Sequence, residues 1–366
     1  MTSFFDSIPL ELFSRKISPT SKKLYTLLET ANKFTKTAKV VVEDFTLECS
    51  SSLSRTSNRY FPEEIRKSIK VITTKRVVLS FNSREIEIKF MVCGNILFDV
   101  HKYVPYLKLW FSLMTLILPY KDVNQKLTID IYLTDFKKLM PKNGDGYTSK
   151  HVNSAFTYVC REYGEITIYR KEEWFKVLLH ECIHSYCLDF STENDERLRH
   201  CLYQYFPFHI TNAKFSETYT ETWAEIMNCA IISFIDSGEG YRNFSLFFNF
   251  YIQVERVHSV IQFNKILRSY GLSYENLREK KSNWNQETHV FEYHILKTAL
   301  LYSYDKFIDW CYMYNGKTLI SFNKKALVEF CKLIMKCYDN SDFKRIVRRL
   351  KKKDNGISMR MSISEI

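Results

Sequence analysis

The chain has 366 residues, 45% of them hydrophobic, which suffices for one large domain or two ordinary ones with a proper core. Phe and Tyr are abundant (28 and 24) while Gly and Pro are scarce (9 and 7), which excludes a disordered chain and favours long helices with short connections. The net charge is +12, but seven basic residues fall within positions 344–353, so the excess is mainly local.

The N-terminal half is predicted to mix helices and strands. Residues 19–38 carry apolar side chains at helical spacing, and Pro62-Glu63-Glu64 opens a second, short helix. Between them, the Ser-rich stretch Cys49–Asn58 is the best candidate for a boundary. Two alternating runs around residues 82–85 predict a β-hairpin. After it we expect a buried helix at 103–118, a strand at 127–133, a Gly-containing loop at 141–150 and a short strand at 165–169.

The second half reads as helical almost throughout. Candidate helices lie near 216–236, 243–258, 290–312 and 324–350. We therefore expect an α+β chain in four parts: an N-terminal helical segment with its connection (1–60), a sheet with a metal-binding helix (61–195), a helical subdomain (196–342), and a basic helix end with a loose tail (343–366).

Compartment signals are few. The N-terminus lacks the basic and apolar regions of a secretory signal, which favours an intracellular protein that is not secreted. The longest apolar stretch, Leu109–Tyr120, is shorter than the roughly 20 residues that span a bilayer, so no integral membrane segment is expected. The ten cysteines form no Cys-x-x-Cys pair, which predicts reduced core residues without disulfides.

The strongest motif is His180-Glu181-Cys182-Ile183-His184, within the apolar helix predicted for Glu172–Leu188. Residues four apart on a helix lie one above the other, so His180 and His184 can share one Zn²⁺ ion, and Glu181 faces the same open coordination position. Zinc lowers the pKa of its bound water towards roughly 7, and Glu181 is the candidate base that takes the proton. Two core histidines one turn apart are the alternative reading.

A third zinc ligand is expected from the helix at 216–236. Glu217, Glu221 and Glu225 are spaced four apart along one face of that helix, and only one can bind the ion directly. Glu221-Thr-Trp-Ala-Glu225 resembles the E-x-x-A-E helix of lethal-factor-like gluzincins and the E-x-x-x-D/E pattern of thermolysin-like enzymes, in which the first acid binds zinc. The resemblance therefore implies Glu221 as the ligand and Glu225 as an acid that orients the site, with Glu217 as the alternative ligand.

Further site residues follow from the same resemblance. Asp189 resembles the acid that follows the motif in thermolysin-like enzymes, at one residue longer spacing, although it also fits a helix-terminating Asp. Gluzincins usually supply an oxyanion donor from beyond the third ligand, and Tyr293 and His294 fit that order, with Tyr219 as runner-up.

The order of elements also resembles the zincin metallopeptidases, in which an edge strand beside the active-site helix offers free backbone groups to an extended substrate. An exposed edge can accept a peptide as a further strand. The candidate substrate-binding strand consists of Glu165, Ile166, Thr167, Ile168 and Tyr169. The segment 127–230 further resembles a family of HExxH proteins in nucleocytoplasmic large DNA viruses, which implies a viral source.

Three functions are consistent with these patterns. The first is a zinc-dependent peptidase that cleaves a protein or peptide substrate in the host-cell cytoplasm or in the virion. The second is a virion-associated or structural protein in which the metal only stabilises the fold. The third is a protein that binds nucleic acid or another anionic partner through residues 343–353, where basic side chains alternate with an apolar helical face; a solvated helix explains that pattern equally well.

Overall fold

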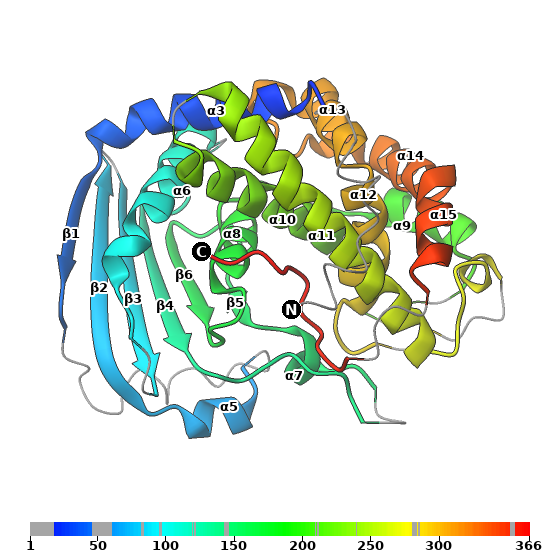
Figure 1. The fold of residues 1–366 in the computed structure, drawn as a ribbon, viewed down its shortest axis with the longest axis horizontal. Helices are drawn as coiled ribbons and strands as arrows, with labels where there is room; N and C mark the ends of the chain where they lie inside the picture. The colour runs from blue at the N-terminus through cyan, green and yellow to red at the C-terminus, as the bar shows by residue number, and fades with distance from the viewer. Residues whose placement is uncertain are drawn as a thin grey trace.

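The computed structural model describes residues 18–45 and 61–366, except 82–83, 95–96, 119, 121, 143–145, 209, 211, 239, 280–283, 285 and 352–355. The predicted α+β class is confirmed. A mixed sheet occupies the N-terminal half, and the C-terminal half is mainly helical (Figure 1). The Ser-rich connection predicted at 49–58 lies outside the described residues.

Six strands form one sheet within the described part of the chain, in the order β1-β2-β3-β4-β6-β5. Their bounds are β1 (Lys39–Glu43), β2 (Val71–Phe81), β3 (Arg84–Cys93), β4 (Lys126–Leu133), β5 (Ala155–Thr157) and β6 (Tyr163–Ile168). The pairs β3–β4 and β4–β6 are parallel and the other pairs are antiparallel. The predicted hairpin is β2–β3, whose alternating side chains, such as Ile86, Ile88 and Phe90, are fully buried.

The predicted helices of the second half are present, and several are longer or more divided than expected. The helices of the described residues are α3 (Ser21–Phe34), α5 (Glu63–Ser68), α6 (Val104–Ile117), α7 (Ser149–Val152), α8 (Trp174–Ser185), α9 (Glu196–Tyr205), α10 (Ser216–Asp236), α11 (Tyr241–Ser269), α12 (Lys297–Tyr302), α13 (Tyr304–Asn315), α14 (Leu327–Tyr338) and α15 (Ser341–Arg349). A π-helical segment, η4 (Phe291–Leu296), leads into α12. No helix in these parts of the chain has the length and apolar character that crossing a membrane requires.

Helices α8 and α10 lie at the centre of the molecule, where the sheet meets the helical half (Figure 1). Every residue of α8 is buried, because the sheet covers one side of it and α10 the other. Helix α10 is likewise buried from Ser216 to Ser233. Any polar side chain on the facing sides of these helices must therefore find a partner inside the protein.

The edge of the sheet differs from the prediction. Strand β6 pairs with β4 on one side and with β5 on the other, so the expectation that Glu165–Tyr169 forms the edge is wrong. The edge strand is β5, only three residues long, which follows α7 and pairs antiparallel with β6. Burial agrees with this, since Ile166, Thr167, Ile168 and Tyr169 are all buried inside the sheet.

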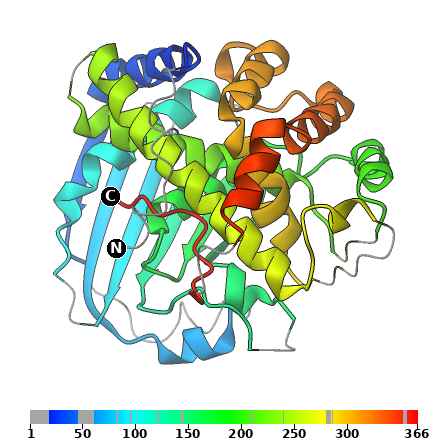
Figure 2. The ribbon, with the colours of Figure 1, turned by 45° about the vertical axis from the view of Figure 1, so that its right-hand side comes forward.

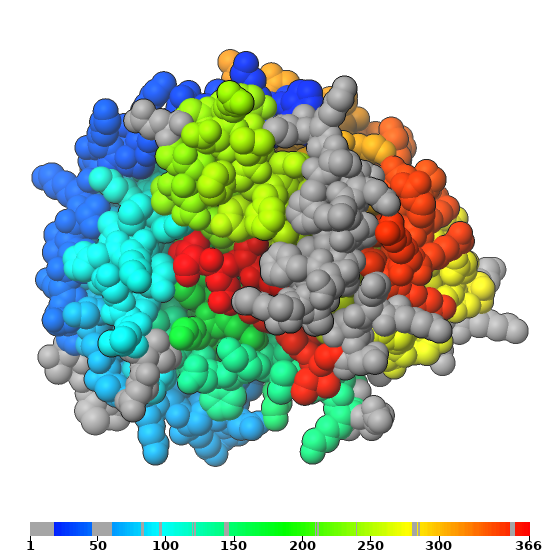
Figure 3. Space-filling view, in the orientation of Figure 1, coloured from blue at the N-terminus to red at the C-terminus, as the bar shows by residue number. Residues whose placement is uncertain are grey.

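Residues 357–364 are not the loose tail that was expected. The segment crosses the molecule between α11 and the sheet (Figures 1 and 2). The side chains of Met359 and Ser362 are fully buried. Its backbone N–H groups are taken by two buried carboxylates: Glu173 accepts from Met361, and Glu255 accepts from residues 363 and 364. Figure 3 shows the segment (red) at the surface beside α11 (yellow-green). Carboxylates from distant elements thus accept the backbone hydrogen bonds that a strand or helix would otherwise provide.

Two cysteine pairs are joined, which corrects the prediction of reduced cysteines. Cys160 is bonded to Cys187, and Cys201 to Cys331, with Cα–Cα distances of 5.1 and 6.4 Å. The partners lie 27 and 130 residues apart in the chain, so tertiary packing alone brings them together. Five other cysteines of the described residues are buried and free: Cys93, Cys182, Cys229, Cys311 and Cys337.

Candidate metal centre

Two helices present facing columns of charged and metal-ligating side chains. On α8 the column is Lys176, His180 and His184; on α10 it is Glu217, Glu221 and Glu225. Each column has a spacing of four residues, which places its members on one side of the helix. Because α8 packs against α10, the basic column meets the acidic one inside the protein.

Three ligand atoms converge at one point between these helices. Nε2 of His180 lies 3.1 Å from Nε2 of His184, and Oε2 of Glu217 lies 3.2 Å and 3.1 Å from these two nitrogens. The three side chains are buried and form a group able to hold a metal ion. Tetrahedral ligands at about 2.0 Å from zinc lie roughly 3.3 Å apart, so the observed triangle fits such an ion.

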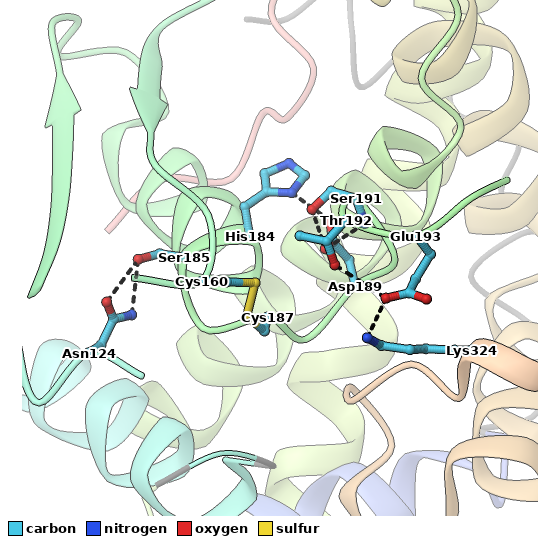
Figure 4. Close-up of a disulfide and its surroundings, with 10 residues drawn as sticks. All are labelled: Asn124, Cys160, His184, Ser185, Cys187, Asp189, Ser191, Thr192, Glu193 and Lys324. Carbon is cyan, nitrogen blue, oxygen red and sulfur yellow. Dashed lines mark hydrogen bonds and ion pairs between the residues drawn. A yellow bond between two sulfur atoms is a disulfide. The ribbon is translucent and has the colours of Figure 1, made fainter. Parts of the chain in front are cut away.

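His184 is held from its other side by Asp189. The carboxylate Oδ2 lies 2.5 Å from Nδ1 of His184 and also accepts from the Thr220 hydroxyl at 3.0 Å. The second oxygen, Oδ1, accepts from the backbone N–H and the hydroxyl of Ser191 (Figure 4). A carboxylate at Nδ1 fixes the ring so that Nε2 presents its lone pair, as in metal-binding histidines. Asp189 therefore lies where an acid can orient the His184 ring.

His180 is held in the same way by Glu221, the acid that the resemblance favoured as third ligand. Oε2 of Glu221 lies 2.8 Å from Nδ1 of His180, on the side of the ring away from the convergent atoms. Glu217, the alternative, is the acid that joins the two Nε2 atoms. Glu217 contacts both histidines, whereas Glu221, one turn later, contacts His180 through Nδ1. Glu225 lies one turn further still and pairs with Lys297 at 2.6 Å.

Glu181 faces the same space as the histidines. It is 8% exposed and lines the cavity that contains His180, His184 and Glu217. Burial raises the pKa of the Glu181 carboxyl, against the two histidines, which lower it. A carboxyl group so placed can exchange a proton with a water molecule at the open side of the three ligands.

Of the three candidate oxyanion donors, the structure brings one to the site. The Tyr293 hydroxyl donates to Oε2 of Glu217 at 2.8 Å and lines the cavity. Tyr219 is fully buried elsewhere and donates to the carbonyl of Ile320 at 2.7 Å. His294 is also buried and is not among the residues that line the cavity.

The cavity over the site has a volume of about 830 Å³, large enough for several residues of an extended chain. One wall is the edge strand β5 with the residues that follow it; a second is the loop 212–214; a third is the segment 287–289. Helix α8 and the ligand Glu217 form the floor. Strand β5 therefore runs along the opening in which the ligand atoms lie.

The electrostatics of the site favour a cation. Burial alone would lower the pKa of His184, but the carboxylates of Glu217 and Asp189 raise it to about 10. For Glu217, burial raises the pKa, yet His184 and Lys214 together hold it well below the usual range. The negative charge that attracts a proton to these rings would also attract a metal ion.

Sequence reasoning missed three parts of the site. Strand β5 is too short to show alternation, and Lys214 lies in an unpatterned loop, although its Nζ is 3.0 Å from Oε1 of Glu217. Lys176 lies one turn before His180, and its spacing from the two histidines was a usable signal.

Comparison of the chain with known protein families, with curated proteins and with solved structures finds no match.

Proposed function

We propose that the protein is a zinc-dependent peptidase with His180, His184 and Glu217 as the metal ligands. The observation that carries the proposal is the convergence of these three ligand atoms at 3.1–3.2 Å beside a buried glutamate, Glu181. Two histidines and one glutamate are a common ligand set of catalytic zinc sites, which keep a fourth position for water.

The metal and two side chains would each have a separate role in hydrolysis. Bound zinc supplies Lewis acidity and lowers the pKa of a coordinated water. Glu181 would accept a proton from the attacking water and return it to the leaving amine. The Tyr293 hydroxyl, next to the ligand carboxylate, is placed to donate a hydrogen bond to the oxyanion.

The substrate is proposed to be an extended peptide. Strand β5 ends the sheet and borders the cavity, so its outer backbone groups are available for pairing with a further strand. A peptide added there would pass over the floor formed by α8. A metal that served only stability would not require a cavity of this size over the ligands, nor Glu181 on its floor. The resemblance to viral HExxH proteins further suggests an intracellular, virus-encoded enzyme.

The proposal is tested by metal analysis and peptide-library cleavage with the purified protein. Wild type is expected to contain one zinc per chain, and His184→Ala is expected to lose it. Glu181→Gln should keep the metal and lose about 10²- to 10⁴-fold in cleavage rate, because only the proton transfer is removed. Wild type without stoichiometric zinc, or equal cleavage by Glu181→Gln, would contradict it.

A further inference from the structure

Lys176 is a buried cation directly behind one metal ligand. It precedes His180 by one turn of α8, is 2% exposed, and places its Nζ 2.6 Å from Oε1 of Glu221. The other oxygen of Glu221 lies 2.8 Å from Nδ1 of His180. A continuous chain of contacts therefore runs from the ammonium group through the carboxylate to the imidazole ring.

The chemistry of this chain of contacts requires the lysine. A histidine that binds a metal through Nε2 is neutral and carries its proton on Nδ1, where it donates to the carboxylate. The imidazole then supplies no charge to balance Glu221, which is 1% exposed. A buried carboxylate needs a cation as partner, and Lys176 is that cation.

We propose that Lys176 is a positioning residue of the metal centre. It holds the Glu221 carboxylate in the orientation that accepts the hydrogen bond from Nδ1 of His180, and thereby directs Nε2 of His180 at the metal. This inference rests on the metal site of the proposed function. Lys176 itself touches neither the metal position nor the substrate.

The lysine is fixed by two further groups. Its Nζ lies 4.0 Å from Oε1 of Glu173 and 3.9 Å from the sulfur of Met361. Met361 belongs to the segment 357–364, and its N–H donates to Glu173. The ammonium group is thus enclosed by the two carboxylates and the thioether, and a rotation away from Glu221 would leave these contacts.

The structure contains a matched pair that isolates the effect. Lys297 is 1% exposed, and its Nζ lies 2.6 Å from Oε1 of Glu225, one turn further along α10. The geometry and burial equal those of Lys176 with Glu221. Glu225, however, has its contact with Lys297 and not with a ligand histidine. Loss of Lys297 should therefore disturb the fold to a similar degree, while Glu221 keeps its direct contacts with Lys176 and His180.

The test compares Lys176→Met and Lys297→Met with wild type. Zinc affinity is measured by competition with a chelator, the Co²⁺-substituted proteins are compared by visible absorption, and folding stability is measured in parallel. Lys176→Met should bind zinc about tenfold more weakly and shift the Co²⁺ spectrum, because the partner of a ligand is disturbed. Lys297→Met should lose stability comparably and keep wild-type zinc affinity and spectrum.

A double variant covers the case in which Lys176→Met does not fold. Lys176→Met combined with Glu221→Gln removes both charges of the pair, and it should bind zinc as Glu221→Gln alone does. Equal zinc affinity of Lys176→Met and wild type, an equal loss in Lys297→Met, or a double variant tenfold weaker than Glu221→Gln would overturn the role of Lys176. Wild type that binds no zinc would overturn the proposed function as well, so the two failures are distinguishable.

Discussion

The hydroxyl of Tyr293 lies 2.8 Å from Oε2 of Glu217, the same oxygen that lies within 3.2 Å of both histidine Nε2 atoms. The tyrosine comes from η4, and Glu217 from the first turn of α10, so the contact joins two elements 76 residues apart. Burial and the adjacent Glu217 carboxylate raise the pKa of Tyr293, which keeps the phenol protonated and able to donate. The ligand set and the candidate oxyanion donor are therefore structurally coupled.

Tyr293→Phe is expected to lower the rate of peptide cleavage by about 10²-fold or more at unchanged zinc content, because an oxyanion donor is lost while the ligands stay. Tyr219→Phe is the control, since it removes a buried tyrosine hydroxyl that contacts no ligand. Cleavage kinetics and metal content of both variants check this. Equal rates for Tyr293→Phe and wild type would exclude Tyr293 as the donor.

The choice between Glu217 and Glu221 as zinc ligand can be decided by substitution. Glu217→Ala removes one of three ligand atoms and should abolish stoichiometric zinc. Glu221→Gln should retain zinc with an affinity about 10- to 100-fold lower, because it only weakens the support of His180. Chelator competition measures both. The reverse order of the two effects would restore Glu221 as the ligand.

The ion pair between Glu173 and Lys138 is expected to make the folding stability depend on pH. Burial alone would raise the pKa of Glu173, but Lys138 and Lys176 lower it to about 2, from an ordinary value of 4.5. A group with a lowered pKa in the folded state stabilises the protein above pH 4.5, and that contribution is lost as the pH falls towards 2.

Between pH 5 and pH 3 the free energy of unfolding of wild type should therefore fall by about 2 kcal/mol more than that of Glu173→Gln, which cannot titrate. Urea titrations at both pH values measure the difference. Parallel declines in the two proteins would show that Glu173 does not carry this charge in the folded state.

The Cys160–Cys187 disulfide is expected to stabilise the walls of the site. It closes a loop of 27 residues that contains the whole of α8, so replacing both cysteines with serine should cost about 3 to 4 kcal/mol of unfolding free energy. Denaturant unfolding of the double variant and of wild type measures the cost. Peptide mapping without reductant provides the direct check, and free thiols at both positions in oxidised wild type would refute the pairing.

Most of the fold follows from periodicity. Helix α10 has the predicted bounds, 216–236, because its apolar residues recur at helical spacing over 21 positions. The hairpin β2–β3 follows from alternation over long strands. Strand β5 could not be predicted because three residues are too few to show an alternating pattern. Its place at the edge of the sheet depends on pairing with β6.

The candidate site, like the fold, could be predicted only where its residues are close in sequence. The spacing of His180, Glu181 and His184 is local and therefore readable from sequence. Glu217 and Glu221 share one helical stripe, so the pattern offers both, and only the crossing of α8 and α10 distinguishes the ligand from the supporting acid. Disulfide pairing depends equally on contacts between distant segments.

The position of segment 357–364 in the chain limits when its contacts can form. It is synthesised after every helix that binds it, and until it leaves the ribosome the carboxylates of Glu173 and Glu255 lack their backbone partners, while Lys176 lacks Met361. Chains are synthesised at about 5 to 20 residues per second, so α8 and α10 can pack first, with Lys176 already paired to Glu221 and Glu173 to Lys138, before these further partners arrive. We expect the surroundings of Lys176 to reach their final form only after this segment has been translated.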